Sequence, residues 1–122
     1  GFALVALLGG RAPQSGAPAV VRTNPAAGAV VAPGPLELSV TFDRSMREGN
    51  FSFVQTDAET YPACGRNEPV QTKDGRTFTL TCRVEAGRSY EVWFNREPYM
   101  NFKGIDGSPA VPFQLKFRTK GR

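Results

Sequence analysis

The 122-residue chain contains no histidine. Histidine is the commonest general base and a frequent ligand of transition metals, so the usual catalytic triads and cupric sites are excluded. Two cysteines without a histidine cannot complete a zinc site. No two of the candidate carboxylates stand out as an acid–base pair, because each lies where solvent-exposed carboxylates ordinarily occur. The sequence therefore predicts that the chain is not an enzyme and carries no metal or cofactor.

The chain also lacks an apolar run long enough to cross a bilayer. The apolar run at residues 2–8 fits the lower limit of a signal-peptide core, and Ala17-Pro18-Ala19 has the small-x-small form of a cleavage site. No Met or basic segment precedes this run. We interpret residues 1–19 as the remainder of an export signal and a Gly/Pro-rich linker, which predicts a periplasmic or extracellular protein. Alternatively, residues 2–8 form a first strand.

Charge of one sign is only slightly in excess. The chain has 15 Lys and Arg against 11 Asp and Glu, a net charge of +4. No segment gathers these cations into a dense run, which is what a nucleic-acid-binding surface would need. We interpret the charges as an ordinary solvated surface and predict no nucleic-acid partner.

Apolar and polar residues alternate along several short segments. In residues 36–43, Leu36, Leu38, Val40 and Phe42 alternate with polar side chains. Because successive side chains of a strand point to opposite faces, each segment has one apolar face. The alternation recurs, after a shorter apolar segment at 20–22, in residues 51–55, 77–84, 89–95 and 113–119.

One-faced strands of this kind belong to antiparallel sheets, and two such sheets bury their apolar faces against each other. Turn sequences rich in Gly, Pro, Asn and Asp separate the segments. No window favours a long helix, although residues 44–49 could form one helical turn. The sequence predicts an all-β, Ig-like antiparallel β-sandwich of about seven strands over residues 20–120.

The segment 89–95 carries two further predictions. Its alternation directs Tyr90 inward and Trp93 and Asn95 outward. Tyr90 follows a tight turn at Ala86-Gly87, so its hydroxyl can bond back to the turn backbone, as in the tyrosine corner of sandwich folds. We therefore predict a structural role for Tyr90.

The stretch VVRTNPAAGAVVAPGPLELSVTFDRSM resembles the opening of the bacterial Ig-like domains named after the S-layer protein SbsA. Those domains begin with a short apolar strand, a P-x-x-G turn and a strand that ends in VTFD-x-x-M. KDGRTFTLTC, VEAGRSYEVWF and FKGIDGSPAVPFQLKFRT are similar as well, so the resemblance spans residues 19–119. It implies that Met46 fills one end of the core and that Asp43 caps the turn.

A more distant resemblance joins the P-x-x-G segment to CopC-like periplasmic copper-binding sandwiches. Those proteins use histidine for cupric copper and clusters of methionine for cuprous copper. This chain has no histidine and only Met46 and Met100, so the ligand set is missing.

The two cysteines depart from the SbsA-type pattern. Cys82 is on the inward phase of its strand, and Cys64 lies in the turn-rich segment ETYPACGRNEP. We predict a Cys64–Cys82 disulfide, which would restrain the loop between them by about 3 kcal/mol in the chain-entropy model. The alternatives are a buried free Cys82 with a surface Cys64, or a metal-binding pair.

A candidate binding surface surrounds Trp93. Aromatic and basic side chains side by side are typical of interfaces and carbohydrate platforms. The alternative is that the long loop 95–112 folds over this sheet and covers the aromatic residues. The candidate binding residues are Trp93, Arg96, Tyr99, Phe102, Lys116 and Arg118.

Together these features predict a non-enzymatic exported domain that acts as an interaction or spacer module at the bacterial envelope. Its partner would be an envelope protein or a glycan, with no transmembrane span in the domain. The first alternative is a carbohydrate- or protein-binding module that uses the surface around Trp93. A divergent periplasmic metal carrier is the second alternative.

Overall fold

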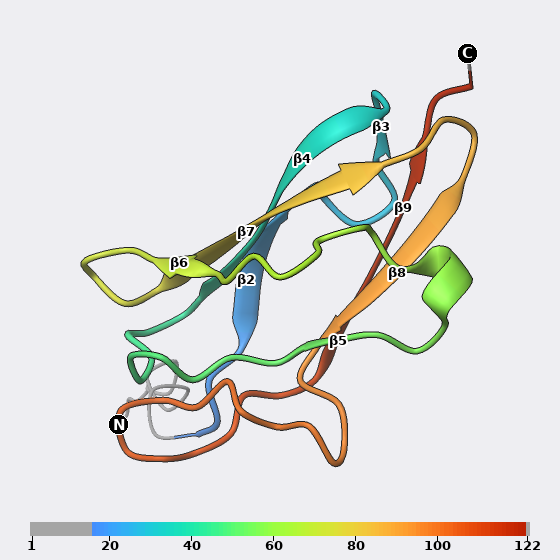
Figure 1. The fold of residues 1–122 in the computed structure, drawn as a ribbon. Helices are drawn as coiled ribbons and strands as arrows, with labels where there is room; N and C mark the ends of the chain where they lie inside the picture. Colours follow the sequence, from blue (N-terminus) through green and yellow to red (C-terminus); the bar gives the residue numbers. More distant parts are fainter. Residues whose placement is uncertain (1–15, 122) are drawn as a thin grey trace, which may run out of the picture.

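The computed structural model describes residues 16–121, which fold into eight β-strands and one turn of 3₁₀ helix (Figure 1). The 3₁₀ helix η2 (Ala58–Thr60) follows β5. The strands are β2 (Val20–Asn24), β3 (Val30–Val31), β4 (Gly34–Phe42), β5 (Phe53–Val54), β6 (Val70–Gln71), β7 (Thr77–Val84), β8 (Ser89–Phe94) and β9 (Phe113–Thr119).

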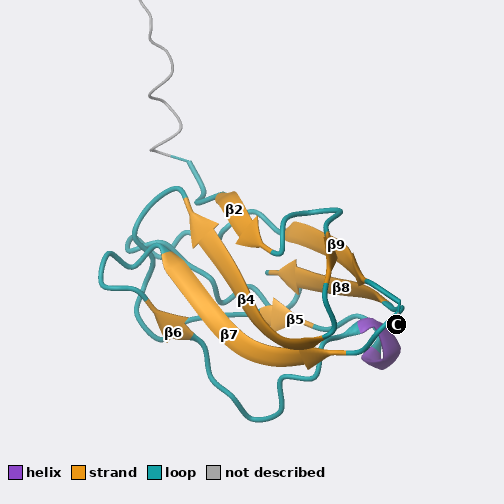
Figure 2. Ribbon diagram, turned by 90° about the horizontal axis from the view of Figure 1, so that it is seen from above, coloured by secondary structure: helices purple, strands orange, loops and turns teal. Residues whose placement is uncertain are grey.

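The strands form two four-stranded sheets that face each other (Figure 2). One sheet has the order β2-β4-β7-β6 and the other β3-β9-β8-β5. This arrangement confirms the predicted all-β Ig-like sandwich. The pairing of β3 with β9 is parallel, whereas the other strand pairs are antiparallel.

The structure has eight strands where the sequence predicted about seven, because the first strand is divided between the two sheets. The chain leaves β2 at Asn24 and turns through residues 25–29, where Gly28 adopts φ = 80°. It then enters β3 in the opposite sheet. At two residues each, β3 and β6 are too short for alternation to reveal them.

Alternation predicted the inward residues of the long strands correctly. Phe78, Leu80, Cys82 and Val84 of β7 are buried, as are the inward side chains of β4. At one end of the core, five phenylalanine rings lie with centroids 4.9–6.3 Å apart, mostly edge to face. These rings belong to Phe42, Phe53, Phe78, Phe94 and Phe102.

The corner after β4 closes the same end of the core. Met46 is only 2% exposed, which matches the role that the family resemblance implied for it. Asp43 does not cap its own turn. Its carboxylate accepts a hydrogen bond from the backbone N–H of Ala19 at 3.3 Å and pairs with Arg44 at 2.9 Å. Residues 44–49 form a bend and a turn, so the single helical turn suggested there is wrong.

The tyrosine corner is present as predicted. The hydroxyl of Tyr90 accepts a hydrogen bond from the backbone N–H of Glu85 at 2.7 Å. Tyr90 is buried and its ring stacks on Phe117, with centroids 5.5 Å apart. This contact fixes the β7–β8 turn to the core.

Residues 16–19 lie against the sandwich ahead of β2. Pro18 is buried, and its carbonyl accepts a hydrogen bond from the N–H of Val111 at 2.9 Å. The predicted signal core at residues 2–8 lies outside the described residues. Within residues 16–121, no helix is long and apolar enough to cross a membrane.

Candidate functional site

Trp93 projects from the outer face of the β3-β9-β8-β5 sheet and is half-buried. The guanidinium of Arg96 lies over the indole ring, 4.7 Å from its centroid. The indole Nε1–H donates a hydrogen bond to Glu91 at 3.0 Å. One indole face is therefore covered by a cation and the N–H is already paired, so Trp93 is not a free stacking platform.

Glu91 is the centre of this network. Its carboxylate also accepts hydrogen bonds from Gln114 of β9, at 2.5 Å, and from Thr56, at 2.8 Å. The hydrogen bonds from Gln114 and Thr56 lower the pKa of Glu91, aided by Trp93 and the positive charge of Lys116, against a smaller effect of burial. The outer face is thus an ordered, charged surface rather than an apolar patch.

The two basic residues predicted on β9 lie beside this network. In the β8–β9 ladder, Lys116 lies directly opposite Glu91, and Arg118 lies directly opposite Ser89. Both line a hollow of about 400 Å³ that extends to Thr60 of η2. The hollow has a positive side and an ionised carboxylate, so it suits a partner with a negative group and hydrogen-bond donors.

The structure does not bring all six predicted binding residues together. Trp93, Arg96, Lys116 and Arg118 share the outer face, whereas Phe102 is 0% exposed and packs among the core phenylalanines. Its placement on a binding surface was wrong, because the 95–112 loop inserts this ring into the open end of the sandwich. Tyr99 is 60% exposed but lies at a groove on the edge of the molecule.

Asn95 was expected outward and is instead fully buried. The backbone leaves strand geometry there, with φ = 68°, so the alternation stops one residue earlier. The side-chain amide donates to the carbonyls of Phe102 and Ala110, at 2.9 and 3.0 Å, and accepts from the N–H of Phe102 at 2.9 Å. Asparagine is enriched at positive φ, and that is the one signal the sequence offered.

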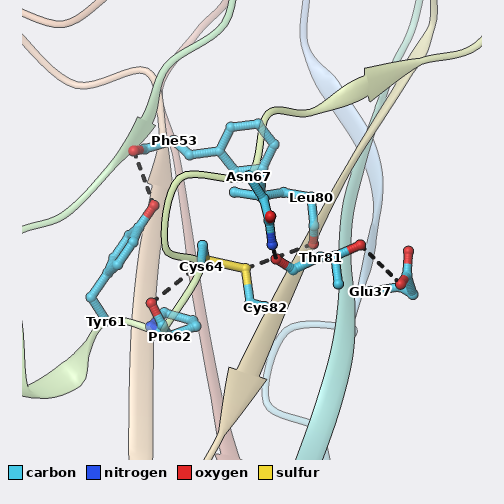
Figure 3. Close-up of a disulfide and its surroundings, with 9 residues drawn as sticks. All are labelled: Glu37, Phe53, Tyr61, Pro62, Cys64, Asn67, Leu80, Thr81 and Cys82. Atoms are coloured by element: carbon cyan, nitrogen blue, oxygen red, sulfur yellow. Dashed lines mark hydrogen bonds between the residues drawn. A yellow bond between two sulfur atoms is a disulfide. The ribbon is translucent and has the colours of Figure 1, made fainter.

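The Cys64–Cys82 disulfide is confirmed, across a separation of 18 residues (Figure 3). It ties the segment after η2 to the buried face of β7. Two backbone hydrogen bonds between Ala63 and Arg83, at 3.0 and 2.8 Å, run beside it. The bridge thus attaches an irregular segment to the sandwich, and Cys64 lines the same groove as Tyr99.

Metal-ligating side chains do not gather in the part of the chain that the structure describes. No group of three or more His, Cys, Asp or Glu is close enough there to hold an ion. Every buried side-chain nitrogen or oxygen in residues 16–121 has a hydrogen-bond partner. Asp74 and Asp106 make local turn contacts, the first with Thr72 and the Arg76 N–H, the second with the Ser108 N–H.

Comparison with known proteins agrees with this geometry. The model of a bacterial Ig-like domain family matches residues 14–119. A crystal structure of the S-layer protein rSbsC(31-844) superimposes with a TM-score of 0.57 at 18% sequence identity, covering 91% of this chain and 15% of that one. The chain therefore spans less than a sixth of the S-layer protein that it matches. No curated protein matches.

Proposed function

Because the chain belongs to the bacterial Ig-like domain family, we propose that it serves as a non-enzymatic, load-bearing spacer in an exported envelope protein. The observation that carries this proposal is the parallel pairing of β3, which continues the first strand in the opposite sheet, with the last strand, β9. The match to one part of a much longer S-layer protein supports it, since the equivalent fold there is one part of a longer chain.

The path of the chain explains why that pairing matters. The described chain enters at the lower end of the sandwich, before β2, and leaves at the upper end, after β9 (Figure 1). A pull on both ends draws β3 downward and β9 upward, along their common axis. Such a pull strains the bonds of the ladder together, whereas a pull across the strands opens them one at a time.

Backbone hydrogen bonds at the ends of the β3–β9 ladder help to connect the two segments. The N–H of Gly28 donates to Lys116 at 2.7 Å, that of Arg118 to Ala29 at 2.9 Å, and that of Lys120 to Val31 at 2.9 Å. The antiparallel β2–β4 ladder lies on the same load path and is strained in the same sense. The fold thus resists extension between its ends with two ladders, one in each sheet.

Single-molecule force spectroscopy tests this proposal. The domain is pulled through its two ends and, separately, through cysteines placed across the sheet, and the end-to-end geometry should give the higher unfolding force. Lys120→Pro removes the N–H that bonds Val31 and should lower the end-to-end force, whereas Lys120→Ala keeps that N–H and should not.

A crosslinked variant covers the case in which Lys120→Pro does not fold. Val30 and Arg118 are direct partners, and neighbouring strands lie about 4.8 Å apart, which suits a disulfide. Val30→Cys with Arg118→Cys should raise the end-to-end unfolding force when oxidised and should match the reduced original chain when reduced. Equal forces in both pulling geometries would rule out the load-bearing role.

The hollow at Lys116 and Arg118 supports a second candidate, an interaction surface for an anionic envelope polymer or protein. Binding would involve Trp93, Arg96, Lys116 and Arg118, and Tyr99 only for a partner that reaches around the edge. Titration with polygalacturonate should show binding that falls with salt and weakens in Lys116→Ala with Arg118→Ala. Lys73→Ala is the matched control, and equal weakening there would refute a specific site.

A further inference from the structure

A groove of about 540 Å³ runs along one open side of the sandwich, between the edge strand β5 and the segment attached by the disulfide. We call it the edge groove. Figure 3 shows Phe53, Tyr61, Cys64, Asn67 and Leu80 of its lining around the disulfide. Tyr99 and Asn101 line the same groove from the 95–112 loop. Its volume lies within the roughly 300–1,000 Å³ of small-ligand sites.

No charged side chain of the described residues lines the edge groove. This is unusual for a chain with 26 charged residues, 15 basic and 11 acidic. A groove without charges gives an ionic ligand no counter-charge, so desolvating that ligand would be uncompensated. Charge complementarity therefore favours a neutral occupant.

The polar groups of the groove are mostly amides and phenols. The side chains of Gln55 and Asn101 are exposed and make no hydrogen bond within residues 16–121. Each amide offers two donors and an acceptor, which matches vicinal hydroxyl groups that both donate and accept. Free amides at a groove wall are therefore suited to a polyhydroxylated ligand.

Aromatic rings complete the lining. Tyr99 is 60% exposed at the rim, so its ring is free to pack against an apolar ligand face. Tyr61 is half-buried and donates its hydroxyl to the carbonyl of Phe53 at 3.1 Å. A pyranose ring presents C–H groups on its faces and hydroxyls at its edge, and both kinds of group find a counterpart here.

The groove wall is held in place before any ligand arrives. The Cys64–Cys82 disulfide, the Tyr61–Phe53 hydrogen bond and a 2.7 Å bond from Asn67 to the Thr81 carbonyl all tie it to the sheets (Figure 3). A preformed wall lowers the entropy lost on binding. This also gives the disulfide a role beyond the stability of the loop.

We propose that the edge groove binds a short segment of a neutral glycan. Tyr99 provides the stacking face, and Gln55 and Asn101 bond the hydroxyls. This site is separate from the β8–β9 outer face and from the load path, so the binding experiment below and the force experiment fail independently.

The test is a titration of the oxidised protein with cellotetraose and with tetra-N-acetylchitotetraose, followed by two-dimensional NMR. Amide shifts should be confined to residues 51–55, 61–69 and 99–101 and to Leu80 for at least one probe. Tyr99→Ala should weaken binding about tenfold, and Asn101→Ala should weaken it as well. Ile105→Ala, an exposed apolar residue outside the groove, should leave affinity unchanged.

Several results would overturn the proposal. One is the absence of shifts at millimolar concentrations of both glycans. Another is an affinity that Tyr99→Ala leaves unchanged while the variant keeps its melting temperature. A third is binding of polygalacturonate, or of an uncharged extended peptide, at the groove in preference to both neutral glycans.

Discussion

Asn95 and Phe102 are joined by two hydrogen bonds of 2.9 Å each, in which the buried amide replaces a strand partner for the Phe102 backbone. A third bond of 3.0 Å joins the same amide to the carbonyl of Ala110. The Asn95 side chain thus holds both ends of residues 102–110, within the 95–112 loop. The loop in turn holds the Phe102 ring at the centre of the phenylalanine cluster.

Replacing Asn95 with Ala should therefore be among the most damaging single changes. It leaves the Ala110 carbonyl and the Phe102 N–H buried without the amide, while the Phe102 carbonyl keeps its bond from the Ala110 N–H, which predicts a loss of about 3 kcal/mol in the free energy of unfolding. Chemical denaturation followed by fluorescence measures this. Asn101→Ala, an exposed amide six residues later, is the control and should stay within about 0.5 kcal/mol of the original chain. Similar values for both variants would contradict the role of Asn95.

This residue also shows where sequence patterns stop being informative. The bounds of β7 and β9 match the alternating segments because side-chain phase is a local property of a strand. The burial of Asn95 depends on contacts 7 and 15 residues later, which no local pattern encodes. The prediction that Phe102 lies on a binding surface was wrong for the same reason, because the 95–112 loop has no alternation of apolar and polar residues.

The sequence likewise predicted one part of the candidate site and missed another. The outward phase of β8 and β9 correctly grouped Trp93, Lys116 and Arg118 on one face. It could not reveal that Arg96 covers the indole ring, because that contact depends on how the chain turns after β8. The edge groove was not foreseen, since its walls come from four separate segments.

The Cys64–Cys82 disulfide should contribute to stability as well as to the groove. Replacing both cysteines with Ala removes a link that closes an 18-residue separation, which predicts a loss of about 3 kcal/mol. Denaturation of this variant and of the reduced original chain should give similar midpoints, both below that of the oxidised chain. Identical midpoints for oxidised and reduced protein would refute a stabilising bridge.

A smaller loss of stability is expected when the hydrogen bond of the tyrosine corner is removed. Tyr90→Phe keeps the stacking on Phe117 but removes the acceptor of the Glu85 N–H, so the free energy of unfolding should fall by about 1 kcal/mol. Tyr99→Phe is the matched control, because the Tyr99 side chain is exposed. Thermal unfolding of both variants separates the two cases. A larger effect at Tyr99 would show that the corner bond is unimportant.

The lowered pKa of Glu91 predicts how the free energy of unfolding depends on pH. Hydrogen bonds from Gln114 and Thr56 hold its pKa below the usual value of 4.5 in the folded state. As the pH falls, the unfolded chain therefore binds a proton before the folded chain does. The contribution of Glu91 to the free energy of unfolding is complete above about pH 5.5 and is lost as the pH falls through the pKa of the folded state. Asp43 acts in the same direction: burial raises its pKa, but bonds from Arg44 and the Ala19 N–H outweigh this and lower it.

Glu91→Gln isolates this effect, because the amide does not titrate. The melting temperatures of the original chain and of Glu91→Gln should differ most near neutral pH and converge as the pH falls from about 6 to about 2.5. The fluorescence of Trp93 gives a local readout, since protonation of Glu91 weakens the bond from the indole N–H. Gln114→Ala removes the first cause of the shift and should move this fluorescence transition to higher pH. A transition at the same pH in Gln114→Ala and the original chain would show that the network does not set the pKa of Glu91.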